Sequence, residues 1–118
     1  HAKNLSFMYQ GRQIRLAPFY DMMCINIYKD LSQKLAMKIG GENRPEWIMA
    51  RHWHRFAEEI KISKATLRKR LTEFCFKLIK AIDTTHSNFI IRHQGDSLVD
   101  DVIATIKKRV GKTLQQFE

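Results

Sequence analysis

The first 23 residues, HAKNLSFMYQGRQIRLAPFYDMM (1–23), decide how the chain begins to fold. Two short apolar runs, LSFMY (5–9) and QIRLAP (13–18), flank a turn in which Gly11 can adopt a positive φ. Pro18 ends the second run, because proline cannot donate a hydrogen bond to a strand ladder. The stretch therefore predicts a β-hairpin.

The segment after the hairpin is less regular. Residues 20–35 fit a loop with a helical turn, and Leu35, Met37 and Ile39 then alternate as in a strand over KLAMKIGGEN (34–43). The glycine pair in this segment lacks the spacing of a dinucleotide-binding loop, so it predicts a turn rather than a phosphate cradle.

Three helices are predicted in the remainder, over 44–60, 62–82 and 97–111, with a partly extended linker at 84–96. Pro45 suits the first helical turn and Ser63 suits an N-cap. Ser97 and Asp100 have the spacing of a capping box, Gly111 is the expected stop, and the last seven residues are expected to fray. Apolar residues at helical spacing mark the buried faces: Met49, Trp53, Phe56 and Ile60; Leu67, Leu71, Phe74, Leu78 and Ile82; Val99, Val102, Ile103, Ile106 and Val110.

The overall pattern is one α+β domain over residues 1–118, with a small β portion followed by a mainly helical bundle. An apolar fraction of 44% argues against disorder. Two widely spaced cysteines without a CxxC motif indicate reduced thiols and a cytoplasmic protein. No apolar run approaches the ~20 residues of a membrane span, and no signal peptide is expected.

The formal net charge of +9 favours polyanionic partners. Residues 51–80 carry nine Lys or Arg against three Glu. Arg68, Lys69 and Arg70 are consecutive, so their side chains fan around the helix. This basic stretch is either a solvated helix face or a surface that contacts the phosphate backbone of nucleic acid.

Two histidines flank Trp53 in RHWHRF (51–56). His52 and His54 are two positions apart, whereas a helical metal pair has i, i+4 spacing. We therefore interpret them as surface or helix-cap residues.

Asn4 and Asp21 lie at the two ends of the predicted hairpin. An amide oxygen and a carboxylate brought together there can share one Mg²⁺, with waters and substrate phosphates completing its octahedron. Protein kinases hold their metal ions with an Asn and an Asp of this kind.

The blocks HAKNLSFMY, LAPFYDMM, KLAMKIGGE and RHWHRFAEEI resemble, in this order, the motifs of HipA-like kinases over residues 1 to about 60. The catalytic loop of that family is similar to D-x-H-x-K-N, and His1, Lys3 and Asn4 match its end. The resemblance implies a kinase-like C-terminal lobe that lacks its catalytic Asp, which is expected two residues upstream of His1.

Further roles follow from the resemblance. Asn4 and Asp21 would bind Mg²⁺, and His1, Lys3, Asn4, Tyr20 and Asp21 would line the ATP site. YDM stands where many kinases have DFG, which puts a DFG-flip type of regulation in doubt. The parent would be a serine/threonine kinase toxin whose substrate is a translation-related protein, such as an aminoacyl-tRNA synthetase. The present chain alone would be inactive.

The expected partners of such a parent are a HipB-like helix-turn-helix antitoxin and operator DNA, which Arg68, Lys69 and Arg70 would contact. Two other functions stay open from the residues alone. One is a non-enzymatic, basic helical module that binds nucleic acid, and the other is a small interaction domain without phosphate chemistry.

Overall fold

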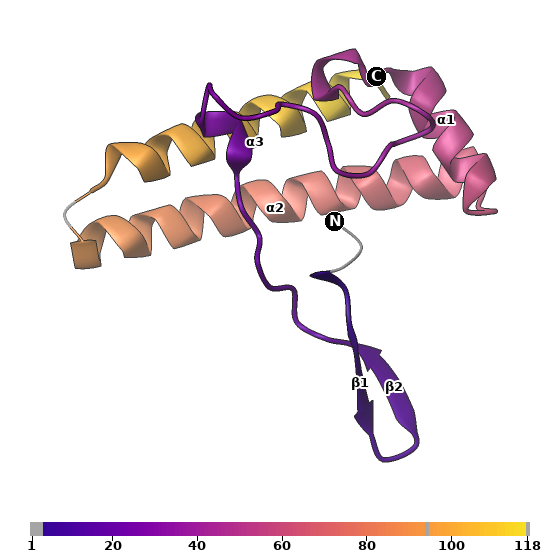
Figure 1. Ribbon diagram of the computed structural model, residues 1–118, viewed down its shortest axis with the longest axis horizontal. Coiled ribbons are helices and arrows are strands. Elements are labelled where there is room, and N and C mark those ends of the chain that lie inside the picture. Colours follow the sequence, from indigo (N-terminus) through magenta and orange to yellow (C-terminus); the bar gives the residue numbers. More distant parts are fainter. Residues whose placement is uncertain (1–3, 94, 118) are drawn as a thin grey trace.

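A computed structural model describes residues 4–93 and 95–117. The elements follow the order β1 (Phe7–Gln10), β2 (Gln13–Leu16), η2 (Ile25–Ile27), η3 (Pro45–Trp47), α1 (Ala50–Glu59), α2 (Lys64–His93) and α3 (Ser97–Gln115). Figure 1 shows the antiparallel helices α2 and α3 side by side, with α1 crossing one end of the pair. The segment between η2 and η3 packs against α3. The α+β architecture predicted from the sequence is confirmed.

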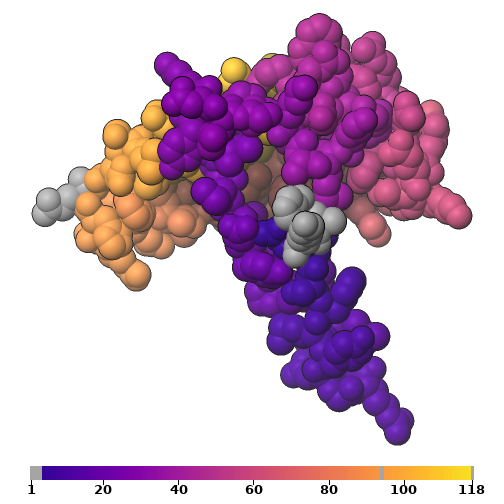
Figure 2. Space-filling model, viewed as in Figure 1, coloured from indigo at the N-terminus to yellow at the C-terminus, as the bar shows by residue number. Residues whose placement is uncertain are grey.

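The predicted hairpin is present, and it projects away from the helices as an arm (Figure 2). Phe7 pairs with Leu16 and Tyr9 with Ile14, while the Ala17 amide donates to the Ser6 carbonyl at 2.8 Å and extends the pairing. Alternation places Phe7, Tyr9, Ile14 and Leu16 on one face. All four are at least half exposed, so the apolar face of the arm is uncovered.

The strand predicted through Leu35, Met37 and Ile39 is wrong, whereas the turn predicted at Gly40 and Gly41 is confirmed. Among the described residues there is no neighbouring strand for it, so the segment closes on itself. Ile39 and Glu42 exchange backbone hydrogen bonds of 2.8 and 3.1 Å across a turn in which Gly40 and Gly41 both have positive φ. The Leu35 amide donates to the Asn43 carbonyl at 2.7 Å, which closes a wider loop.

The helix predicted over 44–60 is two elements, η3 and α1. Ile48 and Met49 adopt extended backbone between them, and the Met49 amide donates to His52 Nδ1 at 2.9 Å. His52 thus caps α1, which agrees with its interpretation as a helix-cap residue. Trp53 and Phe56 are half-buried and meet edge to face, with ring centroids 6.2 Å apart.

The predicted linker over 84–96 is also wrong, because α2 continues to His93. Its apolar stripe extends at helical spacing through Ile82, His86 and Phe89, which are all half-buried. Contacts with α3 stabilise this extension: His86 Nε2 lies 2.9 Å from Asp100 Oδ1, and Lys107 Nζ lies 2.7 Å from Asp83 Oδ1. The N-cap prediction is confirmed, since Ser63 Oγ accepts from the Thr66 amide at 3.0 Å.

Two details of α3 differ from the prediction. Its N-cap is Asp96, whose carboxylate accepts from the Leu98 amide at 2.8 Å, and not Ser97. The helix continues through Gly111 to Gln115, so Gly111 is not a stop and residues 112–115 do not fray.

The buried core is small and lies where the helices and the segment before α1 meet. The apolar side chains with the least exposure are Ile48, Ala57, Leu67, Cys75 and Val110. The rest of each predicted stripe is half-buried or exposed, and Phe74 is 59% exposed. No described helix combines the length and apolar character needed to cross a membrane.

Candidate metal and nucleotide site

The hairpin brings Asn4 and Asp21 together. Asn4 Nδ2 donates to Asp21 Oδ2 at 2.7 Å, across a separation of 17 positions in the sequence. The Asn4 amide oxygen and the second oxygen of Asp21 have no hydrogen-bond partner among the described residues. Two hard oxygen atoms from opposite stems of the arm therefore remain available at one place.

The backbone at Asp21 is unusual. Its φ is +53°, in the left-handed region that L-residues other than Asn, Asp and Gly rarely occupy. Such conformations cost free energy and are concentrated at functional sites. Asp21 is thus held in a specific orientation at the point where the hairpin returns to the body.

Two hollows meet at this pair. The larger, of about 530 Å³, lies between the Asp21 segment and α3, and Asn4, Asp21, Met22 and Met23 also line the smaller, of about 340 Å³. Tyr20, which the resemblance assigns to the nucleotide site, lines the smaller hollow. His1 and Lys3, the other two predicted members, lie outside the described residues.

The larger hollow contains cations that the sequence reasoning missed. Lys34 from the loop and Arg109 from α3 line it together with the polar side chains of Asn26 and Thr105. Arg109 is 88 positions from Asp21 in the sequence, and no motif surrounds it, so only the packing of α3 against η2 identifies it. Oxygen ligands and cations around one hollow are groups that can bind a metal ion and phosphate oxygens.

No group of three or more His, Cys, Asp or Glu side chains is arranged for a metal ion in the part of the chain that the structure describes. A site built on Asn4 and Asp21 would thus depend on water and phosphate for its other ligands, which is ordinary for Mg²⁺. His54 does not join His52; it lines a hollow with Arg68 and Phe117.

The structure separates the three consecutive basic residues. Arg68 lines that same hollow at the end of α2, whereas Lys69 and Arg70 are exposed on the outer side of the helix. Lys77 and Lys80 are exposed on the same outer side, given 100° per residue. The candidate polyanion surface is therefore Lys69, Arg70, Lys77 and Lys80, with Arg68 at its margin.

Comparison with known proteins decides the family. Residues 1–82 match the family model of the HipA-like C-terminal domain. The chain belongs to this family. The matched part of this HipA-like chain contains Asn4, Asp21 and α2 as far as Ile82, whereas α3 lies beyond it.

Relatives of the HipA-like chain include a putative kinase, Y4mE, of Sinorhizobium fredii, which is 33% identical over 82 residues. The serine/threonine-protein kinase toxin HipA of Shewanella oneidensis is 30% identical over 82 residues. Both alignments cover 70% of this chain, but 20% and 19% of the relatives. The HipA-like chain thus spans about a fifth of the length of these curated relatives.

The fold has a solved counterpart. The structure of Shewanella oneidensis HipA with HipB and operator DNA matches 97% of the HipA-like chain and 25% of the solved chain, with a TM-score of 0.71 and 24% identity. The arrangement of arm, loop and helices, including α3, is therefore a HipA fold.

Proposed function

We propose that this chain forms the metal-binding side of the active site in a HipA-like serine/threonine protein kinase, which transfers the γ-phosphate of ATP to a protein hydroxyl. The observation that carries the proposal is the Asn4–Asp21 hydrogen bond of 2.7 Å in a chain of the HipA-like family. Both relatives named above are described as kinases, one of them as putative.

Asn4 and Asp21 fit Mg²⁺, because they offer an amide oxygen and a carboxylate oxygen without other partners among the described residues. When bound, the ion would neutralise negative charge on the ATP phosphates. The hairpin stem and the left-handed backbone of Asp21 hold these two side chains at one point. Lys34 and Arg109 add positive charge to the adjoining hollow, which favours phosphate binding.

The resemblance assigns the remaining parts of the reaction to Lys3 and to residues that this chain does not contain. By resemblance, Lys3 would stabilise phosphate charge, and an Asp upstream of this chain would accept the proton of the substrate hydroxyl. A translation-related protein such as an aminoacyl-tRNA synthetase would be the substrate, in the cytoplasm.

The test uses a HipA-like kinase that contains these residues and measures transfer of phosphate from ATP. Asp21→Asn keeps the size of the side chain and tolerates the left-handed backbone, but removes the negative charge. We expect activity to fall by about a hundred-fold or more. Asp101→Asn, a charge-matched change at an exposed position of α3, should leave activity unchanged. Full activity of Asp21→Asn would contradict the proposal.

The chain by itself should not turn over ATP, because the expected base is outside it. Purified residues 1–118, incubated with Mg²⁺, ATP and a protein substrate, should show no phosphate transfer. Robust transfer by these 118 residues would show that the catalytic machinery lies elsewhere than proposed.

We also propose that the parent protein binds a HipB-like antitoxin on operator DNA, as the Shewanella oneidensis structure contains HipA, HipB and operator DNA. Charge reversal at Arg68, Lys69 and Arg70 should weaken operator binding of the complex at low salt, with a smaller effect at high salt. Since Arg68 faces the hollow with Phe117, we expect the Lys69 and Arg70 changes to dominate. Unchanged operator binding would exclude this contact.

A further inference from the structure

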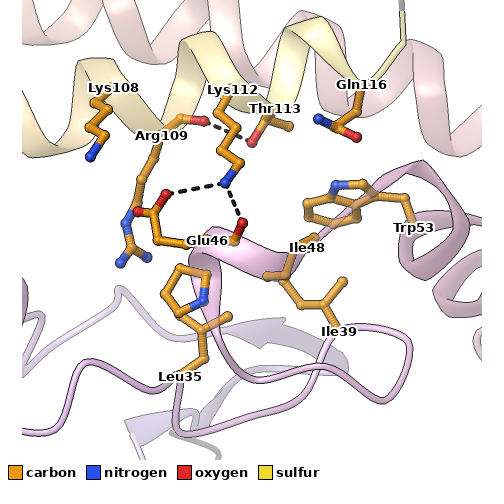
Figure 3. Close-up of a pocket in the computed structure, with 11 residues that line it drawn as sticks. Leu35, Ile39, Glu46, Ile48, Trp53, Lys108, Arg109, Lys112, Thr113 and Gln116 are labelled. Carbon is orange, nitrogen blue, oxygen red and sulfur yellow. Dashed lines mark hydrogen bonds and ion pairs between the residues drawn. The ribbon is translucent and has the colours of Figure 1, made fainter.

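A separate cavity of about 190 Å³ lies between the loop that precedes α1 and the C-terminal half of α3 (Figure 3). One wall is apolar and comprises Leu35, Ile39, Pro45, Ile48 and Trp53. Ile48 belongs to the small buried core, so this wall is continuous with the most tightly packed part of the molecule. The cavity therefore offers a firm apolar surface on one side.

The opposite wall is cationic. Lys108, Arg109 and Lys112 line it from α3, and Glu46 is the one carboxylate among the lining residues. Lys112 Nζ donates to the Glu46 backbone carbonyl and lies 3.1 Å from Glu46 Oε2, so these two charges satisfy each other. Lys108 and Arg109 have no carboxylate partner among the described residues.

The excess charge acts at the cavity itself. The hydrogen bond from Lys112 lowers the pKa of Glu46 most, and the charges of Lys108 and Arg109 lower it further. Figure 3 shows the Arg109 side chain running beside Glu46, with Lys108 on the same side of the cavity. Two cations thus remain available next to an apolar wall.

The volume restricts the occupant. An apolar cavity of about 150 Å³ holds one benzene molecule. A cavity of about 190 Å³ can therefore hold one six-membered ring with a short substituent. A single ring therefore matches the volume of the cavity.

We propose that this cavity binds a small carboxylic acid with one aromatic ring, the ring lying against Ile39, Ile48 and Trp53 and the carboxylate meeting Lys108 and Arg109. The Glu46–Lys112 pair stays intact, and Figure 3 shows it between these cations and Trp53. The site is distinct from the Asn4–Asp21 pair and does not depend on kinase activity, although Leu35 and Arg109 also line the larger hollow beside that pair.

The test titrates the ¹⁵N-labelled 118-residue chain with 3-phenylpropionate and follows the indole N–H resonance of Trp53, assigned with the Trp53→Phe variant. Two comparators separate the contributions: 3-phenylpropionamide retains the ring without the charge, and acetate retains the charge without the ring. We expect the acid to bind at least about ten-fold more tightly than either comparator, since a charged hydrogen bond and the burial of a ring each contribute that much.

The double variant Lys108→Gln/Arg109→Gln should lose about ten-fold in affinity for the acid and keep its affinity for the amide. The control Lys69→Gln/Lys77→Gln removes the same charge from the outer side of α2 and should change neither affinity. Circular dichroism of each variant verifies that its helices are retained. Equal binding of acid and amide, equal loss in both double variants, or no response at Trp53 would each overturn the proposal.

Discussion

Gly40 is the residue whose backbone conformation most restricts substitution. It is buried with φ +53°, and a Cβ built there would lie 2.0 Å from the carbonyl oxygen of His52 and 2.9 Å from its Cα. These are backbone atoms of the first turn of α1, which cannot move aside locally. We expect Gly40→Ala to lower the free energy of unfolding by at least about 3 kcal/mol, measured by urea denaturation with circular dichroism.

Gly95→Ala is the matched control for that experiment. Gly95 also has a positive φ, of +79°, but a Cβ there would meet nothing within 4 Å. It should cost only the left-handed backbone penalty of about 1–2 kcal/mol. Equal losses in the two variants would show that the contact with His52 does not matter.

Glu42 is the residue with the most strongly shifted acidity. Arg44 holds its pKa at about 2 instead of the ordinary 4.5, through side-chain hydrogen bonds and its backbone amide. Because the pKa is depressed in the folded state, the stabilisation by this carboxylate is present above pH 4.5 and disappears as the pH falls through about 2. Carboxyl ¹³C NMR should show that Arg44→Gln raises the pKa of Glu42, whereas Arg55→Gln leaves it in place.

Much of the candidate site could be predicted at the scale of residues. Asn4 and Asp21 were identifiable because a hairpin between them brings its ends together whatever the rest of the chain does. Lys34 and Arg109 could not be identified, since they reach the same hollow only through packing of α3. The sequence can predict a residue's role when one secondary-structure motif brings its partners to it. The sequence cannot predict the role when tertiary packing brings those partners together.

Among the elements, the hairpin and the start of α2 were predictable because a turn glycine and the Ser63 cap act within a few residues. The strand over 34–43 was not, because a strand needs a partner that a local pattern cannot supply. The second half of α2 contains Thr84 and Ser87, whose hydroxyls bond back to carbonyls one turn earlier. Contacts with α3 override this weak helical preference.

Gly111 offers a test of the length of α3. It lies inside the helix at an exposed position, and a Cβ there would meet nothing within 4 Å. Gly111→Ala should therefore stabilise the chain by about 1 kcal/mol, because alanine has the higher helix propensity. Thermal unfolding followed by circular dichroism measures the change, and destabilisation would mean that the helix ends at Gly111.

At the scale of the whole molecule, the chain exposes more surface than a self-sufficient domain of its mass. Its accessible surface is 9547 Å² and its radius of gyration 16.3 Å. A compact monomer of this size would have roughly 6,700 Å² and roughly 13.5 Å. Figure 2 shows the arm projecting away from the helices, an arrangement that adds to both quantities.

The arm should therefore be unstable in the isolated chain, since a lone two-stranded hairpin is marginal in water. We expect the backbone amides of β1 and β2 to exchange with deuterium almost without protection in residues 1–118, and those of α2 near Cys75 to exchange slowly. In a complete HipA-like protein, the same β-strand amides should be protected. Protected strands in the isolated chain would mean that the apolar face needs no cover.

The hydrogen bond between Asn4 and Asp21 forms only when the hairpin arm is folded, because the hairpin brings these two residues together. If the arm melts, the two side chains become the ends of a flexible loop, and bringing them together again costs chain entropy. A cation that needs both oxygens can bind only when the hairpin is folded. Its apparent affinity is therefore reduced by the fraction of molecules in which the hairpin is folded. Conversely, cation binding would stabilise the folded hairpin. A partner that covers the apolar face of the hairpin would increase the affinity for the cation without contacting the ion.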